Sequence, residues 1–245
     1  LHQVGADYAS MGVRYAELSL GDVHLAGRLR AAEEELPKVE AATGVRLRFL
    51  LAISRHDDFE WDQDLIDRVE ALARSRALVG VDFMGHETNS THAFGRQLQR
   101  LADWAHQRRP GFVLRVHAGE NPAHPENVRA ALEHVGARDV CLRIGHGLFG
   151  VDDATLDALA QRGAFVEFNL NSNFALNNIQ TSAEAPLRRY LARGVRCVLA
   201  TDGAGLYQTG LPFEVRAARL CGMTDGELKQ VLEAEVAYLK QREQA

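Results

Sequence analysis

Several features that would assign the chain to a specialised class of protein are absent from its 245 residues. The net charge is -5 and the pI about 6.1, which leaves no basic field for nucleic acid or an anionic membrane surface. No apolar run approaches the roughly 20 residues needed to span a bilayer. We therefore expect a small-molecule partner rather than a nucleic acid polymer or a membrane.

Cysteine is scarce, and the three cysteines, Cys141, Cys197 and Cys221, share no CxxC spacing. Cys141 and Cys197 lie inside apolar stretches, which favours small buried side chains over reactive thiols. A chain without a disulfide framework suits a reducing compartment, and we expect the protein to be cytoplasmic.

No proline- or serine-rich linker, low-complexity tract or change in composition divides the chain. Its hydrophobic fraction of 46% and charged fraction of 25% are those of an ordinary globular protein. Single barrels commonly have this length, so we expect one α/β domain over residues 1–245.

Apolar, β-branched segments alternate with segments of helical periodicity along the whole chain. Strands are expected at Gly12–Leu20, Val45–Ser54, Leu78–Met84, Phe112–Val116, Val140–Ile144, Ala164–Leu170 and Val195–Ala200. A polar loop followed by a helix is expected over 26–43, and helices are expected over 62–76, 91–109, 125–134, 152–162, 183–193, 212–221 and 224–241. This strict alternation predicts a parallel sheet covered by helices.

Polar residues follow the expected strands at their carboxyl ends: Gly85–Glu87, His117–Glu120, His146, Asn171–Asn173 and Asp202. In a (β/α)₈ TIM-type barrel all those ends lie on one face, where the active site is built. An open doubly wound sheet would spread them along an edge, and no G-x-G-x-x-G follows the first strand. We expect a barrel. Since only seven strands can be counted, we expect its first strand to be missing from the amino end.

Four residues of this rim, His117, Glu120, His146 and Asp202, form the candidate catalytic set. Singly, each has an ordinary explanation, such as a helix cap for Asp202 or a solvated loop charge for Glu120. Together they suit hydrolysis by a metal-activated water, because zinc lowers the pKa of its bound water towards about 7. His146 could orient or deprotonate the water, and Glu120, if protonated in a dry pocket, could act as general acid.

The metal site is incomplete in this sequence. His117 and Asp202 supply two ligands, whereas a catalytic zinc ion usually has at least three from the protein. The ten histidines include no H-x-H pair and no H-E-x-x-H motif.

Four motifs in chain order resemble the adenosine/AMP deaminase family of the amidohydrolase superfamily. They are His117-Ala118-Gly119-Glu120, Arg143-Ile144-Gly145-His146-Gly147, Ser172-Asn173 and Thr201-Asp202, with Gly85-x-Glu87 as a weaker fifth match. The resemblance runs from about Gly12 to the end of the chain. It implies a (β/α)₈ barrel with one zinc ion that hydrolyses a purine-like amine, such as adenosine, and releases ammonia.

The resemblance also implies roles for the matched residues. His117 and Asp202 correspond to metal ligands, and Asp202 also contacts the attacking water. His146 corresponds to the histidine that orients that water, and Glu120 to the acid that protonates the purine ring nitrogen. The substrate side of the site would include Gly85, Gly119, Asn173 and Gly203.

Two departures from the family pattern affect these roles. The family's H-x-H on the first strand is absent, so the remaining zinc ligands are expected upstream of Leu1. Gly203 stands where the family usually has a second Asp that holds another purine nitrogen. A site built around a polar edge discriminates strongly, so this change leaves the exact substrate open. Replacement polar contacts could come from His86, Asn169, Asn171, Asn173 or Tyr207.

Two other functions compete with this one. The chain could be another amidohydrolase-type hydrolase that opens a cyclic amide or cleaves an ester. It could also be a non-catalytic, deaminase-like barrel used for binding or assembly. Ammonia release across a panel of amines separates the first from deamination, and an upstream H-x-H separates the second.

Overall fold

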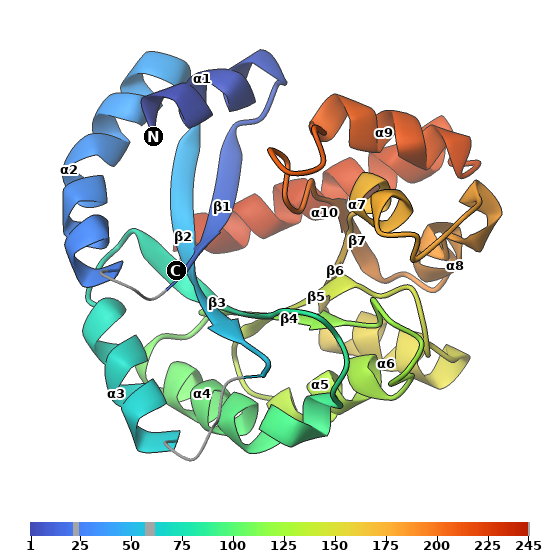
Figure 1. Cartoon of the computed structure of the whole chain (residues 1–245), viewed down its shortest axis with the longest axis horizontal. Helices are drawn as coiled ribbons and strands as arrows, with labels where there is room; N and C mark the ends of the chain where they lie inside the picture. Colours follow the sequence, from blue (N-terminus) through green and yellow to red (C-terminus); the bar gives the residue numbers. More distant parts are fainter. Residues whose placement is uncertain (22–24, 57–61, 245) are drawn as a thin grey trace.

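Seven parallel strands lie side by side in sequence order and curl into a barrel-like wall (Figure 1). The computed structural model describes residues 1–21, 25–56 and 62–244. The strands are β1 (Tyr15–Leu20), β2 (Arg46–Ser54), β3 (Leu78–Met84), β4 (Val113–Ala118), β5 (Cys141–His146), β6 (Phe165–Phe168) and β7 (Arg196–Leu199). Within the described ranges, β1 pairs only with β2 and β7 only with β6. The expected fold, a TIM-type parallel arrangement with seven visible strands, is confirmed.

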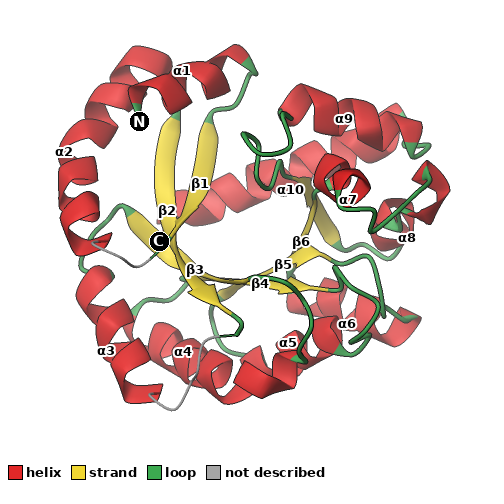
Figure 2. Ribbon diagram, in the orientation of Figure 1, coloured by secondary structure: helices red, strands yellow, loops and turns green. Residues whose placement is uncertain are grey.

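Helices cover the outer side of this wall (Figure 2). The longer ones are α1 (His2–Ser10), α2 (Leu25–Thr43), α3 (Asp62–Leu72), α4 (Gly95–Arg108), α5 (Asn127–Val135), α6 (Asp153–Arg162), α9 (Leu211–Leu220) and α10 (Asp225–Gln244). The shorter ones are η1 (Thr91–Phe94), α7 (Leu170–Ala175), η2 (Ser182–Glu184) and α8 (Leu187–Ala192).

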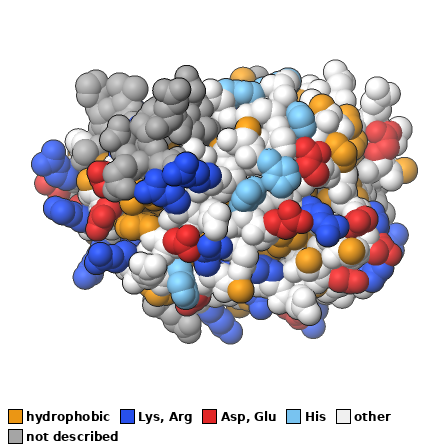
Figure 3. Space-filling model, turned by 90° about the horizontal axis from the view of Figure 1, so that it is seen from below, with side chains coloured by type: hydrophobic (Ala, Val, Ile, Leu, Met, Phe, Trp, Pro, Cys, Tyr) orange, Lys and Arg blue, Asp and Glu red, His pale blue; other side chains and the backbone are white. Residues whose placement is uncertain are grey.

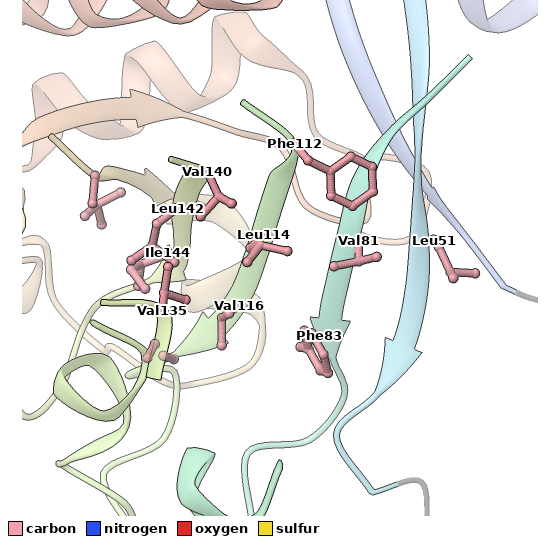
Figure 4. Close-up of a cluster of buried hydrophobic side chains, with 14 of the residues drawn as sticks. Leu51, Val81, Phe83, Phe112, Leu114, Val116, Val135, Val140, Leu142 and Ile144 are labelled. Carbon is pink, nitrogen blue, oxygen red and sulfur yellow. The ribbon is translucent and has the colours of Figure 1, made fainter. Parts of the chain in front are cut away.

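The main core lies between the sheet and these helices. Figure 4 shows side chains of β3, β4 and β5 that project from the strands into this core, among them Val81, Leu114 and Ile144. Successive side chains of a strand point to opposite faces, so the residues between these apolar ones face the interior of the barrel. This alternation explains why charged residues occur in the middle of apolar strands.

A layer of buried charges crosses that interior. Arg115 of β4 donates to Asp82 of β3 at 2.7 Å and to Glu167 of β6 at 2.6 Å. Arg143 of β5 forms ion pairs with Glu167 and with Glu17 of β1. Opposite charges alternate along the layer, so each buried charge has a partner, without which its burial would be very costly.

Helix α10 runs from β7 towards β1 at the end of the barrel where the strands begin (Figure 1). The Tyr238 hydroxyl of this helix donates to Glu17 at 2.6 Å, and its ring packs edge to face on Phe165 with centroids 5.1 Å apart. Together with Leu50, Val113 and Cys141 these side chains form a second apolar cluster at the base.

The sixth strand is shorter than the sequence predicts. It was expected to reach Leu170, but it ends at Phe168, and α7 begins at Leu170. The cause is distant in sequence: the buried Glu214 carboxylate of α9 accepts hydrogen bonds from the backbone N–H of Leu170 at 2.8 Å and of Asn171 at 3.3 Å. This carboxylate satisfies N–H groups at the start of the helix that have no partner within it.

The surface fits the composition. Over the described residues, no helix combines the length and hydrophobicity that crossing a bilayer requires. On the face seen in Figure 3, basic and acidic side chains are intermixed, so no field of one sign covers it. All three cysteines are free; Cys141 and Cys197 are buried.

Candidate active site

Three side chains converge at the carboxyl ends of β4 and β5. Nε2 of His146 lies 3.2 Å from Nδ1 of His117 and 3.6 Å from Oε2 of Glu120. Nδ1 of His117 lies 4.0 Å from the same carboxylate oxygen. The strand register produces this arrangement, since Ala118 pairs with His146 across the ladder and so places the two histidines on neighbouring strand ends. One donor atom of each of the three residues lies within 4.8 Å of the others, a geometry that could hold a metal ion.

His146 is fully buried and held in a left-handed backbone conformation, with φ of 72°. Such strained positions occur preferentially at functional sites. Its Nδ1 lies 2.9 Å from Oδ1 of Asn173, an acceptor, so Nδ1 carries the proton and the Nε2 lone pair faces Glu120. Burial and the charge of His117 lower the pKa of His146, against the opposing effect of Glu120 and Asp202. His146 is therefore neutral near pH 7.

Asp82 of β3 belongs to this cluster, although the sequence analysis did not single it out. Its Oδ1 lies 3.4 Å from Nε2 of His117, and its Oδ2 accepts from Ser19 at 2.5 Å and from Arg115. Burial would lower the pKa of His117, but the Asp82 carboxylate outweighs it and raises that pKa to about 9. In the sequence, the feature that could have indicated a role for Asp82 is its position as the one acid inside the apolar strand Leu78–Met84.

Two buried atoms of this pair lack hydrogen-bond partners among the described residues: Nε2 of His117 and Oδ1 of Asp82. Buried polar atoms are nearly always satisfied, so such a pair calls for an explanation. Imidazole nitrogen and carboxylate oxygen are ligands that suit a divalent transition metal such as zinc. The residues present therefore fit a metal ion.

The raised pKa of His117 predicts how the stability of chelator-treated protein depends on pH. A folded-state pKa of about 9 lies above the ordinary value of 6.5, so the stabilisation is complete below pH 6.5 and is lost as the pH rises through 9. We expect the free energy of unfolding to fall by up to about 3 kcal/mol across this interval. Urea unfolding at a series of pH values measures it. The His117→Gln variant should show a flatter profile, and an unchanged slope would contradict the Asp82–His117 pairing.

Glu120 differs from the expectation of a protonated acid. Burial raises its pKa, but the hydrogen bond from His117 and the positive charges of His117 and Arg55 contribute to outweighing burial, and the pKa falls to about 2. Glu120 is therefore ionised while His117 is charged.

Asp202 follows β7 and lies outside the group of three converging donors, among the residues the structure describes. Its carboxylate nevertheless acts on His146, whose pKa it raises, and its φ of 51° is again left-handed. Beside it, a Cβ added to Gly203 would meet the Tyr207 ring at 3.2 Å. Partial burial and the charges of Asp202 and Glu120 raise the pKa of the Tyr207 hydroxyl.

The two other glycines of the candidate set have different surroundings. Gly85 directly follows β3 and is half-buried, with φ of 112°, a conformation that favours glycine. Gly119 is buried: its N–H donates to Glu87 at 2.9 Å and its carbonyl accepts from Leu148 and Phe149. Gly119 has a left-handed φ of 75°, a conformation that favours glycine in this turn, and its contact with a substrate stays a prediction.

Glu87 holds that turn in place. Its buried carboxylate accepts hydrogen bonds from the backbone N–H of Gly119, of Glu120 at 2.6 Å and of Asn121 at 2.8 Å. The side-chain amide of Asn127 donates to it at 2.6 Å. From the sequence, Glu87 could be identified only as part of the weak Gly85-x-Glu87 motif. Its role in the turn could not be predicted, because the residues that donate hydrogen bonds to it lie 32 or more positions away.

The comparisons with known proteins agree with this geometry. The family model for adenosine deaminase matches residues 3–244. The chain is 29% identical over 251 positions to adenosine deaminase of Erwinia tasmaniensis, covering 98% of this chain and 72% of the relative. For the Serratia proteamaculans adenosine deaminase the identity is 28%, with 97% and 71% covered.

Solved structures share the fold. A zinc-bound amidohydrolase of Burkhoderia ambifaria has a TM-score of 0.74 at 20% identity, covering 97% of this chain and 67% of that one. The N6-mAMP deaminase of arabidopsis has a TM-score of 0.75 at 23% identity, with 97% and 71% covered. The match of the family model over nearly the whole chain, on a fold that gathers His117, Glu120 and His146 at one rim, shows that this protein belongs to the adenosine deaminase family.

Proposed function

We propose that this protein hydrolyses the exocyclic amine of a purine-like substrate, releases ammonia and acts in the cytoplasm. The observation that carries the proposal is the convergence of His117, Glu120 and His146 at the strand ends of a chain that belongs to the adenosine deaminase family. Relatives and structural neighbours bear the names adenosine deaminase, adenine deaminase and N6-methyl-AMP deaminase, all of which describe removal of an amine from a purine.

One zinc ion is the proposed cofactor. His117 would hold it, with Asp82, whose Oδ1 lies 3.4 Å from Nε2 of His117, and Asp202 as the proposed carboxylate ligands. The further ligands would come from an H-x-H segment outside residues 1–245. This segment would lie on a first strand that joins the single domain to which residues 1–245 belong. Bound to these residues, zinc would supply a water of lowered pKa and so a nucleophile near neutral pH.

The protein's own residues move the protons. The Nε2 lone pair of neutral His146 orients the attacking water and accepts its proton. Among the influences on Glu120, burial raises its pKa and so favours the protonated acid, the form that would donate to the purine ring nitrogen.

The identity of the purine depends on the residues around Gly203. Asn173 is already bonded to His146, so its side chain positions the imidazole. The Tyr207 ring packs on Gly203, in the direction that a side chain at position 203 would take. We propose that the Tyr207 hydroxyl and the backbone at Gly85 contact the purine.

The test is release of ammonia from adenosine, AMP and adenine, and of methylamine from N6-methyl-AMP, by zinc-loaded protein, with a cyclic amide and an ester as further substrates. The proposal expects turnover of at least one aminopurine. Hydrolysis of only the amide or ester would instead favour another amidohydrolase reaction. Absence of all turnover would favour the binding or assembly module.

Glu87→Gln should lower kcat about tenfold or more and change KM less. The Gln side-chain NH₂ would face N–H donors, so the turn that carries Glu120 would move from its position. Steady-state kinetics with circular dichroism checks this. The matched control is Glu235→Gln, a half-buried acid on α10. An equal loss in both variants, or a change in KM alone, would argue against a positioning role.

A further inference from the structure

A second group of charged residues lies at the base of the barrel, where the strands begin. A cavity of about 560 Å³ opens there between the starts of β5 and β6 and the carboxyl ends of α6 and α10. Its wall includes Arg162 of α6, Arg196 of β7 and Arg242 of α10. Strand β5 runs from Cys141 in this wall to His146 in the candidate active site, roughly 16 Å at about 3.3 Å per residue. The cavity is therefore separate from that site.

Aromatic rings hold two of the three guanidinium groups. Cζ of Arg196 lies 5.4 Å from the ring centroid of Phe165, and Cζ of Arg242 lies 5.3 Å from that of Tyr238. The two rings pack edge to face with their centroids 5.1 Å apart, so both arginines lie over members of one aromatic pair. A guanidinium stacked by its face on a ring keeps its N–H groups, which lie in its plane, available to an anion.

The third arginine is fixed by the backbone. Nη2 of Arg162 donates to the carbonyl of Arg138 at 2.6 Å and to that of Val140 at 3.3 Å. Its Nε is buried and has no hydrogen-bond partner in the described structure, and the same holds for Nε of Arg242. Two buried donors behind the cavity wall thus lack an acceptor, so no carboxylate of the described residues neutralises either guanidinium at its Nε.

The charges around the cavity favour an anion. Asp139 is the only acid among its lining residues. Glu17, whose carboxylate also interacts with Arg242, is already paired with Arg143 and with Tyr238. Three arginines against one acid leave an excess of positive charge, and Arg109 adds a further positive charge close to Arg242.

We propose that this basal cavity binds a phosphate group, either as free phosphate or as part of a mononucleotide. Forked guanidinium groups match the oxygens of a phosphate, which accept paired N–H donors. The volume is that of an ordinary small-molecule pocket, large enough for a nucleotide as well as for the free ion. Binding here requires no turnover, so its test is independent of the proposed deamination.

Isothermal titration of the folded protein with inorganic phosphate and with AMP, at constant ionic strength set with chloride, tests the proposal. The Arg196→Gln/Arg242→Gln variant should weaken phosphate binding at least about tenfold. Its charge-matched control, Arg28→Gln/Arg30→Gln, alters two exposed arginines of α2 and should keep the affinity. Gln161→Glu gives a second, nearly isosteric test, because Gln161 is exposed at the cavity wall and the change adds a negative charge there.

Tighter binding of AMP than of phosphate, sensitive to these changes, would identify a nucleotide as the occupant. Equal affinities for AMP and phosphate, both weakened by these substitutions, would show that the site recognises the phosphate group alone. The proposal is overturned if phosphate does not bind above the chloride background. It is equally overturned if binding survives in both the double variant and Gln161→Glu.

Discussion

Replacing Glu120 by Gln lowers kcat by about 10²-fold or more while zinc remains bound, if Glu120 is the proton donor. The amide has nearly the same shape but cannot deliver a proton to the ring nitrogen. The acid stands 3.6 Å from Nε2 of His146 and within the turn that Glu87 holds, so the exchange should leave the backbone unchanged. Steady-state ammonia release and elemental analysis of the same sample measure the two quantities.

The matched control is Glu133→Gln, which alters an exposed acid on α5 and should retain full activity. Loss of zinc together with activity in Glu120→Gln would assign Glu120 to metal binding. Unchanged kcat would remove Glu120 from the mechanism.

The second large effect is expected for His146→Gln, which should lower kcat by about 10² to 10⁴-fold. A general base needs a lone pair near the water and a pKa that leaves it neutral, and His146 has both. The glutamine amide can donate and accept hydrogen bonds but cannot take up the proton. Kinetics with the best aminopurine substrate, at several pH values, provides the measurement.

The Asn173→Ala variant tests how much the hydrogen bond between Asn173 and the His146 imidazole contributes to activity. It removes the acceptor for Nδ1 but keeps the base, so we expect a smaller loss of about tenfold. That hydrogen bond raises the pKa of His146, so without it the acidic limb of the kcat/KM profile should move to lower pH. A loss as large as that of His146→Gln, with an unmoved profile, would contradict the proton-accepting role of His146.

The sequence predicted the strands and their parallel arrangement because each strand is marked by a local apolar run and the strands pair in sequence order. Seven apolar runs separated by helices gave all seven strands, and parallel register then places residues at the strand ends, such as His117 and His146, on one rim. The helix α7 could not be predicted, since the Glu214 carboxylate that starts it lies 44 residues further along the chain.

The residues that hold the catalytic side chains in position could not be predicted from the sequence either. Asp82 and Glu87 act through partners on other strands and turns, and a single sequence gives no sign of which distant donors a lone acid will meet. The family resemblance pairs His117 with Asp202 as metal ligands, which stays a prediction, and the structure adds Asp82, whose Oδ1 lies 3.4 Å from Nε2 of His117.

The ion pairs inside the barrel explain why the Asp82 carboxylate lies beside His117. Arg115 joins Asp82 to Glu167, so the orientation of Asp82 depends on a chain of ion pairs that continues through Arg143 to β1. Removing one member would leave a buried charge without its partner, which typically costs about 3–5 kcal/mol.

The most direct test of the account is the zinc content, after equilibrium dialysis against the metal, of protein that includes the proposed H-x-H strand, compared between the unmodified form and His117→Gln. The account predicts about one tightly held ion in the former and its loss in the latter, with the variant still folded. Equal zinc contents, or none in either protein, would contradict a metal centre at His117.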